Sequence, residues 1–146
     1  MRRVRRYVSR AVCIRGGKVL LAKSDRKSNF FLPGGGINNF ESAAAALLRE
    51  LREETNRSAE IVAFIGVVEN NWAEGDVEFY ETNFLFSVSI SGGDLEGRLD
   101  VEAGLSFEWA PLDGIESLDI RPDAVKAYLK DTGDNGRRAL WLSNFR

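Results

Sequence analysis

The feature that most constrains the fold of this chain is a helix-like segment at residues 42–55, which lies between strand-like runs. Residues 42–55 are rich in alanine and leucine, and the turn sequence PGGG at residues 33–36 precedes them. Ser42 is a suitable N-cap, because its hydroxyl can accept a hydrogen bond from the first turn of a helix. Asn56 tolerates the left-handed conformation in which many helices end. The pattern therefore predicts a helix over residues 42–55.

Strand-like runs rich in β-branched and aromatic residues occupy much of the remaining chain. They cover residues 7–14, 18–23, 30–32, 60–68, 78–89 and 105–110. Gly16 and Gly17 between the first two runs predict a hairpin, and Pro122 and Gly133 bracket a second predicted helix over residues 122–130. Strands mixed with two helices predict an α/β fold whose sheet is covered on both faces. With 146 residues, 44 % of them hydrophobic, we expect one domain over residues 1–146.

Composition excludes several classes of chemistry and partner. The chain has no histidine, which removes Ser-His and Cys-His catalysis and every histidine-containing zinc site. A net charge of −2 gives no overall attraction for nucleic acid or an anionic membrane, and the apolar stretches are too short for a membrane segment. Cys13, the single cysteine, cannot form an intramolecular disulfide, so we expect a reducing, cytoplasmic location.

An acidic stripe runs along the end of the first predicted helix. At about 100° per residue, Glu53 and Glu54 fall at about 300° and 40° from Glu50, so the three carboxylates share one face. Leu47, Leu48 and Leu51 lie at roughly 60° to 160° from Glu50 and form the core side of the helix.

A glutamate stripe is usually a solvated surface, but this one breaks two local rules. Glu50 and Glu54 are like charges one turn apart, and Glu53 and Glu54 lie at a helix C-terminus, where the dipole disfavours anions. A hard divalent cation bound by the carboxylates would reverse both penalties. The stripe therefore indicates a metal site.

The spacing around the stripe resembles the signature of the Nudix hydrolases. The matching residues are Gly35, Glu41, Arg49, Glu50, Leu51, Glu53 and Glu54. A chance match of this kind has a probability of about one in 10⁵. Two departures follow the helix, where the family usually has glycine and an aliphatic residue and this chain has Asn56 and Arg57.

The resemblance implies an α/β/α sandwich with a mixed sheet and attack of water on a phosphorus of a diphosphate. Glu50, Glu53 and Glu54, with the carbonyl of Gly35, would hold Mg²⁺, with Mn²⁺ as an alternative. Arg49 would orient the glutamates. Glu41 would be structural, and the proton of the attacking water would go to Glu50, Glu53 or a residue outside the signature.

Residues outside the signature carry weaker predictions. Lys23, Arg26 and Lys27 contact substrate phosphates or belong to a solvated loop. The aromatic residues Trp72, Phe79 and Tyr80 stack on a base or belong to the core. Glu81 or Glu78 supplies a further carboxylate near the metal. The apolar segment 140–142 and Phe145 dock onto the domain or onto a second subunit in a homodimer, and the basic segment 2–10 is a solvated tail or an RNA-binding feature.

The favoured function is a Mg²⁺-dependent pyrophosphohydrolase for a small nucleotide, such as a nucleoside triphosphate or another nucleoside diphosphate derivative. The alternatives are a catalytically silent nucleotide sensor and an enzyme that trims pyrophosphate from RNA 5′ ends. Nudix enzymes that cleave ADP-ribose often carry a proline about fifteen residues after the signature, where this chain has Trp72 and Ala73. This difference makes ADP-ribose a less expected substrate for this chain.

Overall fold

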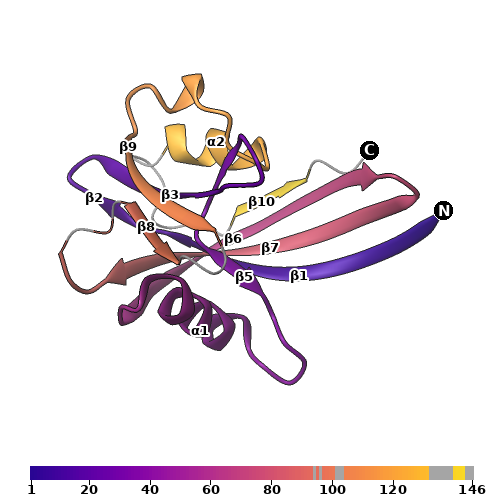
Figure 1. The fold of residues 1–146 in the computed structure, drawn as a ribbon, viewed down its shortest axis with the longest axis horizontal. Helices are drawn as coiled ribbons and strands as arrows, with labels where there is room; N and C mark the ends of the chain where they lie inside the picture. The colour runs from indigo at the N-terminus through magenta and orange to yellow at the C-terminus, as the bar shows by residue number, and fades with distance from the viewer. Residues whose placement is uncertain (94, 96, 101–103, 132–139, 144–146) are drawn as a thin grey trace.

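The computed structural model describes residues 1–93, 95, 97–100, 104–131 and 140–143 (Figure 1). The strands are β1 Arg2–Val12, β2 Ile14–Arg15, β3 Lys18–Ser24, β4 Phe30–Phe31, β5 Gly34–Gly36, β6 Ala59–Glu74, β7 Val77–Ile90, β8 Gly97–Asp100, β9 Leu105–Pro111 and β10 Leu140–Ser143. The helices are α1 Ala43–Thr55, the short 3₁₀ helix η1 Ile115–Ser117 and α2 Ala124–Lys130.

The strands form two sheets. The first has the order β10-β6-β7-β1-β5, with β1 parallel to β7, β10 parallel to β6, and the other neighbours antiparallel. The second has the antiparallel order β2-β3-β9-β8, and β4 pairs with β3. The predicted mixed sheet is therefore confirmed.

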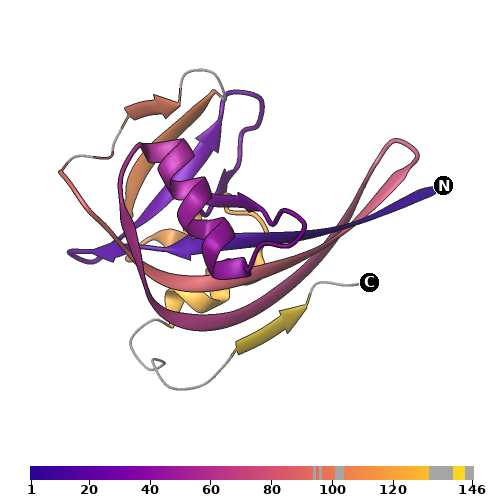
Figure 2. The ribbon, with the colours of Figure 1, turned by 90° about the horizontal axis from the view of Figure 1, so that it is seen from below.

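Two apolar clusters hold the layers together. Leu47 and Leu51 of α1 are fully buried in one cluster, together with residues of β1, β3, β7 and β9. Val125 and Leu129 of α2 belong to the other, which includes residues of β3, β6 and β7. The two helices cover opposite sides of the strands (Figures 1 and 2), which confirms the α/β/α sandwich. Leu48 was expected on the core side but is 38 % exposed, because it lies at the edge of the apolar stripe.

The first predicted hairpin is shorter than its pattern suggested. Gly16 and Gly17, with φ of 57° and 75°, turn the chain between β2 and β3 only. β1 leaves for the other sheet, where it pairs in parallel with β7 from Arg2 to Val12. The basic segment is therefore a strand and not a tail, although four of its five arginines are exposed.

Both ends of α1 follow the sequence pattern. The Ser42 hydroxyl accepts a hydrogen bond of 3.0 Å from the Ala45 N–H, and Asn56 adopts a left-handed conformation with φ of 55°. The second helix begins at Ala124 instead of at residue 122. The Pro122 carbonyl accepts from the Val125 N–H, an i to i+3 contact, so a turn precedes the helix. Gly133 lies outside the described residues.

The far ends of three strands project beyond the layered body (Figures 1 and 2). We call residues 2–6 of β1, 70–74 of β6 and 77–81 of β7 the arm; its β6–β7 turn contains Gly75, with φ of 57°.

The C-terminal strand β10 packs on its own chain, which is one of the two predicted outcomes for segment 140–142. It pairs in parallel with β6, and Leu142 contacts the core while Trp141 stays 68 % exposed. Phe145 lies outside the described residues. No helix among the described residues is long and apolar enough to cross a bilayer.

Candidate active site

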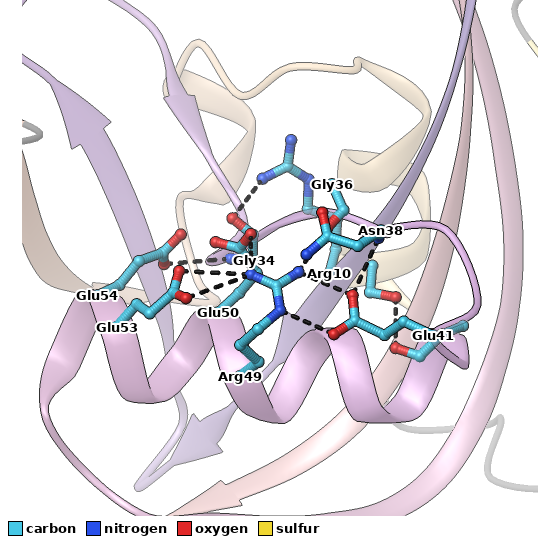
Figure 3. Close-up of polar contacts among 11 residues, drawn as sticks. Arg10, Gly34, Gly36, Asn38, Glu41, Arg49, Glu50, Glu53 and Glu54 are labelled. Carbon is cyan, nitrogen blue, oxygen red and sulfur yellow. Dashed lines mark hydrogen bonds and ion pairs between the residues drawn. The ribbon is translucent and has the colours of Figure 1, made fainter.

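Residues Gly34–Gly36, predicted as part of a turn, form the short strand β5 paired with β1. This segment, called the glycine turn below, packs directly against the glutamates of α1 (Figure 3). A Cβ at Gly35 would lie 2.4 Å from the carboxyl carbon of Glu50, so only glycine leaves room for that carboxylate. Gly34 has φ of 136°, and a Cβ there would lie 2.0 Å from the Ser9 carbonyl oxygen. Gly34 is therefore required for β5 to fit against β1, whereas a side chain at Gly35 would displace the Glu50 carboxylate.

Arg49 connects the turn to the acidic stripe (Figure 3). Its Nε and Nη2 donate to the two carboxylate oxygens of Glu41 at 2.8 and 2.9 Å, and Nη2 also donates to the Gly36 carbonyl at 3.0 Å. Its Nη1 lies 3.0 Å from Glu50 Oε1 and 3.4 Å from Glu53 Oε2. The guanidinium therefore contacts two glutamates of the stripe.

Glu41 completes this network from the loop before the helix. Its carboxylate also accepts a hydrogen bond of 3.0 Å from the Asn38 N–H. The hydrogen bonds from Arg49 and the Asn38 backbone lower the pKa of Glu41 to about 2. The carboxylate is charged at neutral pH and contacts the helix.

The three glutamates of the stripe differ in exposure. Glu54 is only 6 % exposed, and its Oε2 accepts from the Gly34 N–H at 3.3 Å. The Glu50 side chain is 19 % exposed and the Glu53 side chain 58 % exposed. Two carboxylates are therefore held at the glycine turn, while Glu53 faces solvent.

These residues fit a hard divalent cation by their donor chemistry. Carboxylate and carbonyl oxygens are the ligands that such ions prefer, and the Glu50 carboxylate fills the space left by the missing side chain of Gly35. Among the described residues, no group of three or more acidic or cysteine side chains is already arranged to hold a metal ion. An ion at the turn would therefore need the exposed Glu53 side chain to turn toward Glu50 and Glu54.

Arg10 is a site residue that sequence reasoning missed. It donates to the carbonyls of Leu32 and Gly34 at 3.1 and 3.3 Å, and so ties β1 to the glycine turn (Figure 3). Its neighbours at i−2 and i+2, Val8 and Val12, are buried in the core. A charge in the middle of an apolar alternation is the signal that could have identified it.

A large cleft of about 1250 Å³ adjoins this turn at Arg10. It is lined by the arm, by the loop between β3 and β4, and by the segment before α2. The predicted residues in its lining are Arg26, Lys27, Trp72, Glu78 and Glu81.

Several predicted contact residues already have partners. Glu81 is 5 % exposed and lies 3.7 Å from Arg6, while Glu78 pairs with Arg3 outside the signature region. Lys23 lines a separate pocket of about 230 Å³, and its ammonium lies 5.3 Å from the centre of the Phe30 ring.

The two predicted stacking residues of the arm contact one another. Trp72 and Phe79 are cross-strand partners with ring centroids 5.2 Å apart and an interplanar angle of 16°. Neither ring belongs to an apolar core cluster, so the expectation that they are core residues is wrong. Tyr80 donates to Glu78 at 3.4 Å.

The departure at Arg57 has a structural explanation. A Cβ at Gly92 would lie 2.8 Å from Arg57 Nη1, so this side chain packs against the turn after β7. It contacts no glutamate of the stripe in the described contacts.

Residues 5–130 match the NUDIX domain. The chain belongs to the Nudix family. Members of this family generally use divalent metal ions, and the relatives of this Nudix hydrolase include proteins named as pyrophosphatases and diphosphatases.

Two curated relatives share recognisable sequence with this Nudix hydrolase. A protein of Methanocaldococcus jannaschii named ADP-ribose pyrophosphatase is 28 % identical over 118 residues, which cover 74 % of this chain and 68 % of that protein. A Bacillus subtilis protein provisionally named 8-oxo-dGTP diphosphatase is 34 % identical over 90 residues, which cover 62 % of this chain and 56 % of that protein. The chain thus spans little more than half the length of the second relative.

Solved structures share the fold at lower identity. The MutT protein of Bacillus halodurans superposes with a TM-score of 0.71 at 22 % identity, covering 94 % of this chain and 88 % of that one. A UDP-X diphosphatase superposes with a TM-score of 0.68 at 18 % identity, covering 95 % of this chain and 67 % of that one.

Proposed function

We propose that this Nudix hydrolase cleaves a phosphoanhydride bond in a nucleoside diphosphate linked to a further group, and that it requires Mg²⁺ or Mn²⁺. The packing of the Gly34–Gly36 turn against the acidic end of α1 carries the proposal. That packing places two carboxylates beside the glycine turn, and Arg10, which donates to the Gly34 carbonyl, lines a cleft of about 1250 Å³.

The metal ligands in this proposal are the carboxylates of Glu50, Glu53 and Glu54 and the carbonyl of Gly35. When bound there, the ion supplies positive charge to the diphosphate and lowers the pKa of a coordinated water. Arg49 keeps Glu50 in place through its contact of 3.0 Å. Glu53, whose side chain is 58 % exposed, is free to turn toward the ion.

The chain offers three carboxylates that could accept the proton of the attacking water. Glu50 and Glu53 lie on α1, where Arg49 contacts both of them. Glu81 lies on β7 in the lining of the cleft, next to Arg6. We favour Glu50 or Glu53, because they belong to the same face of one rigid helix.

The cleft suggests how the substrate lies. The rigid pair of Trp72 and Phe79 offers a flat aromatic surface for a nucleobase. Arg26 and Lys27 line the cleft, and no ion pair involves their side chains in the described part of the chain. These two cations would attract substrate phosphates.

Two alternatives are less well supported. A silent nucleotide sensor would not need the complete set of Glu50, Glu53, Glu54 and Arg49 that this chain retains. An RNA 5′-end pyrophosphohydrolase would use the arginines of β1. If RNA is the substrate, binding should weaken steeply with salt, whereas a small nucleotide should be far less affected.

A product assay tests the proposal. The protein is incubated with Mg²⁺ and, in turn, nucleoside triphosphates including 8-oxo-dGTP, dinucleoside polyphosphates, nucleotide sugars such as UDP conjugates, and ADP-ribose, and the products are separated by chromatography. We expect cleavage between two phosphorus atoms in at least one class. Phosphate release from nucleoside monophosphates alone would contradict the proposal.

We also propose that residues 1–146 form one domain, since both apolar clusters draw on strands from both sheets. Unfolding in urea should then follow one transition by fluorescence and circular dichroism. Two separated transitions would contradict it.

A further inference from the structure

The guanidinium of Arg10 lies where the glycine turn meets the cleft. Arg10 is on β1, one residue after Ser9, whose carbonyl blocks any side chain at Gly34. It lines the cleft of about 1250 Å³. Its electrostatic neighbours are Glu81, Glu54, Glu50 and Arg6.

One edge of the guanidinium is already occupied. Nη1 donates to the carbonyls of Leu32 and Gly34 at 3.1 and 3.3 Å, and Nε donates to the side-chain oxygen of Asn83 at 3.4 Å. The Phe31 ring centre lies 5.6 Å from the guanidinium carbon. The orientation of the group is therefore fixed before any ligand arrives.

The other edge is open. Within the described part of the chain, Nη2 of Arg10 has no hydrogen-bond or ion-pair partner. The one fully buried side-chain nitrogen or oxygen there without a hydrogen bond is Oδ1 of Asn71. Nη2 is therefore not fully buried, and Arg10 is one of the residues that line the cleft.

The surroundings of Arg10 favour a ligand-binding role over a purely structural one. Burial lowers the pKa of the Arg10 guanidinium, yet arginine remains charged at neutral pH. The nearby carboxylates of Glu81, Glu54 and Glu50 compensate that charge. A fixed cation with free N–H groups is suited to donate a charge-assisted hydrogen bond to a phosphate oxygen.

We propose that Nη2 of Arg10 binds a phosphate oxygen of the substrate, on the cleft side of the glycine turn. The proposal rests on the proposed function for the identity of the ligand as a diphosphate. Arg10 would then hold one phosphate while the carbonyl of Gly34, on its Nη1, keeps the turn and the glutamates aligned with it.

Inorganic pyrophosphate is a suitable probe, because it carries the diphosphate without a base. Calorimetry of the full chain in Mg²⁺ compares the original protein with Arg10→Lys and Arg10→Gln. Loss of a charged hydrogen bond should weaken pyrophosphate binding by about ten- to a hundredfold in Arg10→Gln. Arg10→Lys keeps the charge but loses the planar guanidinium. Its affinity for pyrophosphate should therefore lie between that of the original protein and that of Arg10→Gln.

Arg3→Gln is the matched control. It removes one arginine charge from the same strand, but Arg3 pairs with Glu78 and does not line the cleft. Pyrophosphate affinity should be unchanged in this variant. Melting temperatures and Mg²⁺ affinities of all variants separate loss of phosphate binding from loss of fold or of metal.

Folded Arg10 variants that bind pyrophosphate as tightly as the original protein would overturn the proposal, even if that protein hydrolyses nucleotides. Arg10-dependent binding without hydrolysis of any nucleotide would instead overturn the proposed function. If both variants fail to fold, a crystal structure of the original protein with pyrophosphate decides. A phosphate oxygen within about 3.2 Å of Nη2 supports the proposal, and a phosphate placed elsewhere overturns it.

Discussion

Arg49 is the residue on which the arrangement of the acidic helix depends. Without it, Glu50 and Glu53 would be unscreened like charges at the C-terminal end of α1, where the helix dipole also disfavours anions. Its guanidinium bonds to Glu41, which lies outside the helix, and to the Gly36 carbonyl. The signature arginine therefore aligns the helix and the glycine turn at once.

Replacing Glu41 by glutamine should weaken this alignment in a pH-dependent way. The folded-state pKa of Glu41, about 2, lies below its ordinary value of 4.5. Its contribution to stability is therefore complete above about pH 4.5 and is lost as the pH falls toward 2. We expect Glu41→Gln to melt at a lower temperature than the original protein at pH 7, with a difference that narrows between pH 4.5 and 2. Melting curves at several pH values test this, and a difference that stays constant down to pH 2 would contradict it.

Replacing Glu53 by glutamine separates a metal ligand from a surface residue. The side chain is 58 % exposed, so the metal-free variant should unfold within about 0.5 kcal/mol of the original protein. If Glu53 binds the metal or takes the proton, activity should fall at least about a hundredfold, and Mg²⁺ should raise the melting temperature less. Glu60→Gln, a change at an exposed position on β6, is the control. If the two variants have equal activity and equal increases of melting temperature with Mg²⁺, Glu53 is a solvated surface residue and not a metal ligand.

At the scale of elements, the two ends of α1 were predicted correctly and the long-range strand pairings were not. Ser42 and Asn56 mark both ends of α1, because capping depends on neighbouring residues. The pairing of β1 with β7 joins segments about 75 residues apart, and no turn between them fixes it. For that reason the basic run appeared to be a tail, and the role of Arg10 went unnoticed.

The arm provides a test of how the base is held. Trp72→Ala removes the aromatic surface that faces the cleft, so KM should rise by about ten- to a hundredfold, since stacking on a base is worth about 1–3 kcal/mol. Trp72→Phe should retain most of the affinity. Trp141→Ala is the control, because Trp141 is 68 % exposed on β10 and does not line the cleft. Equal KM values for Trp72→Ala and Trp141→Ala would exclude Trp72 from the base site.

At the scale of the whole molecule, the cleft is assembled from segments that are distant in sequence. Its lining combines β1, the loop after β3, the arm and the segment before α2. A motif confined to residues 35–57 could locate the glutamates but not these walls. Arg26 and Glu81 lie in the lining, whereas Lys23, only three residues before Arg26, lies in another pocket. We expect substrate choice to depend on these walls, so the sequence motif alone could not identify the substrate.

The most direct test of the central claim is hydrolysis with and without a free divalent metal. The protein is assayed on the substrate that the product screen identifies, first with Mg²⁺ and then with excess EDTA, followed by readdition of Mg²⁺. We predict cleavage of a phosphoanhydride bond with Mg²⁺, no turnover in EDTA, and recovery on readdition, because without the ion the carboxylates of Glu50, Glu53 and Glu54 repel the diphosphate. Full turnover in excess EDTA would contradict the claim that these glutamates act through a bound metal.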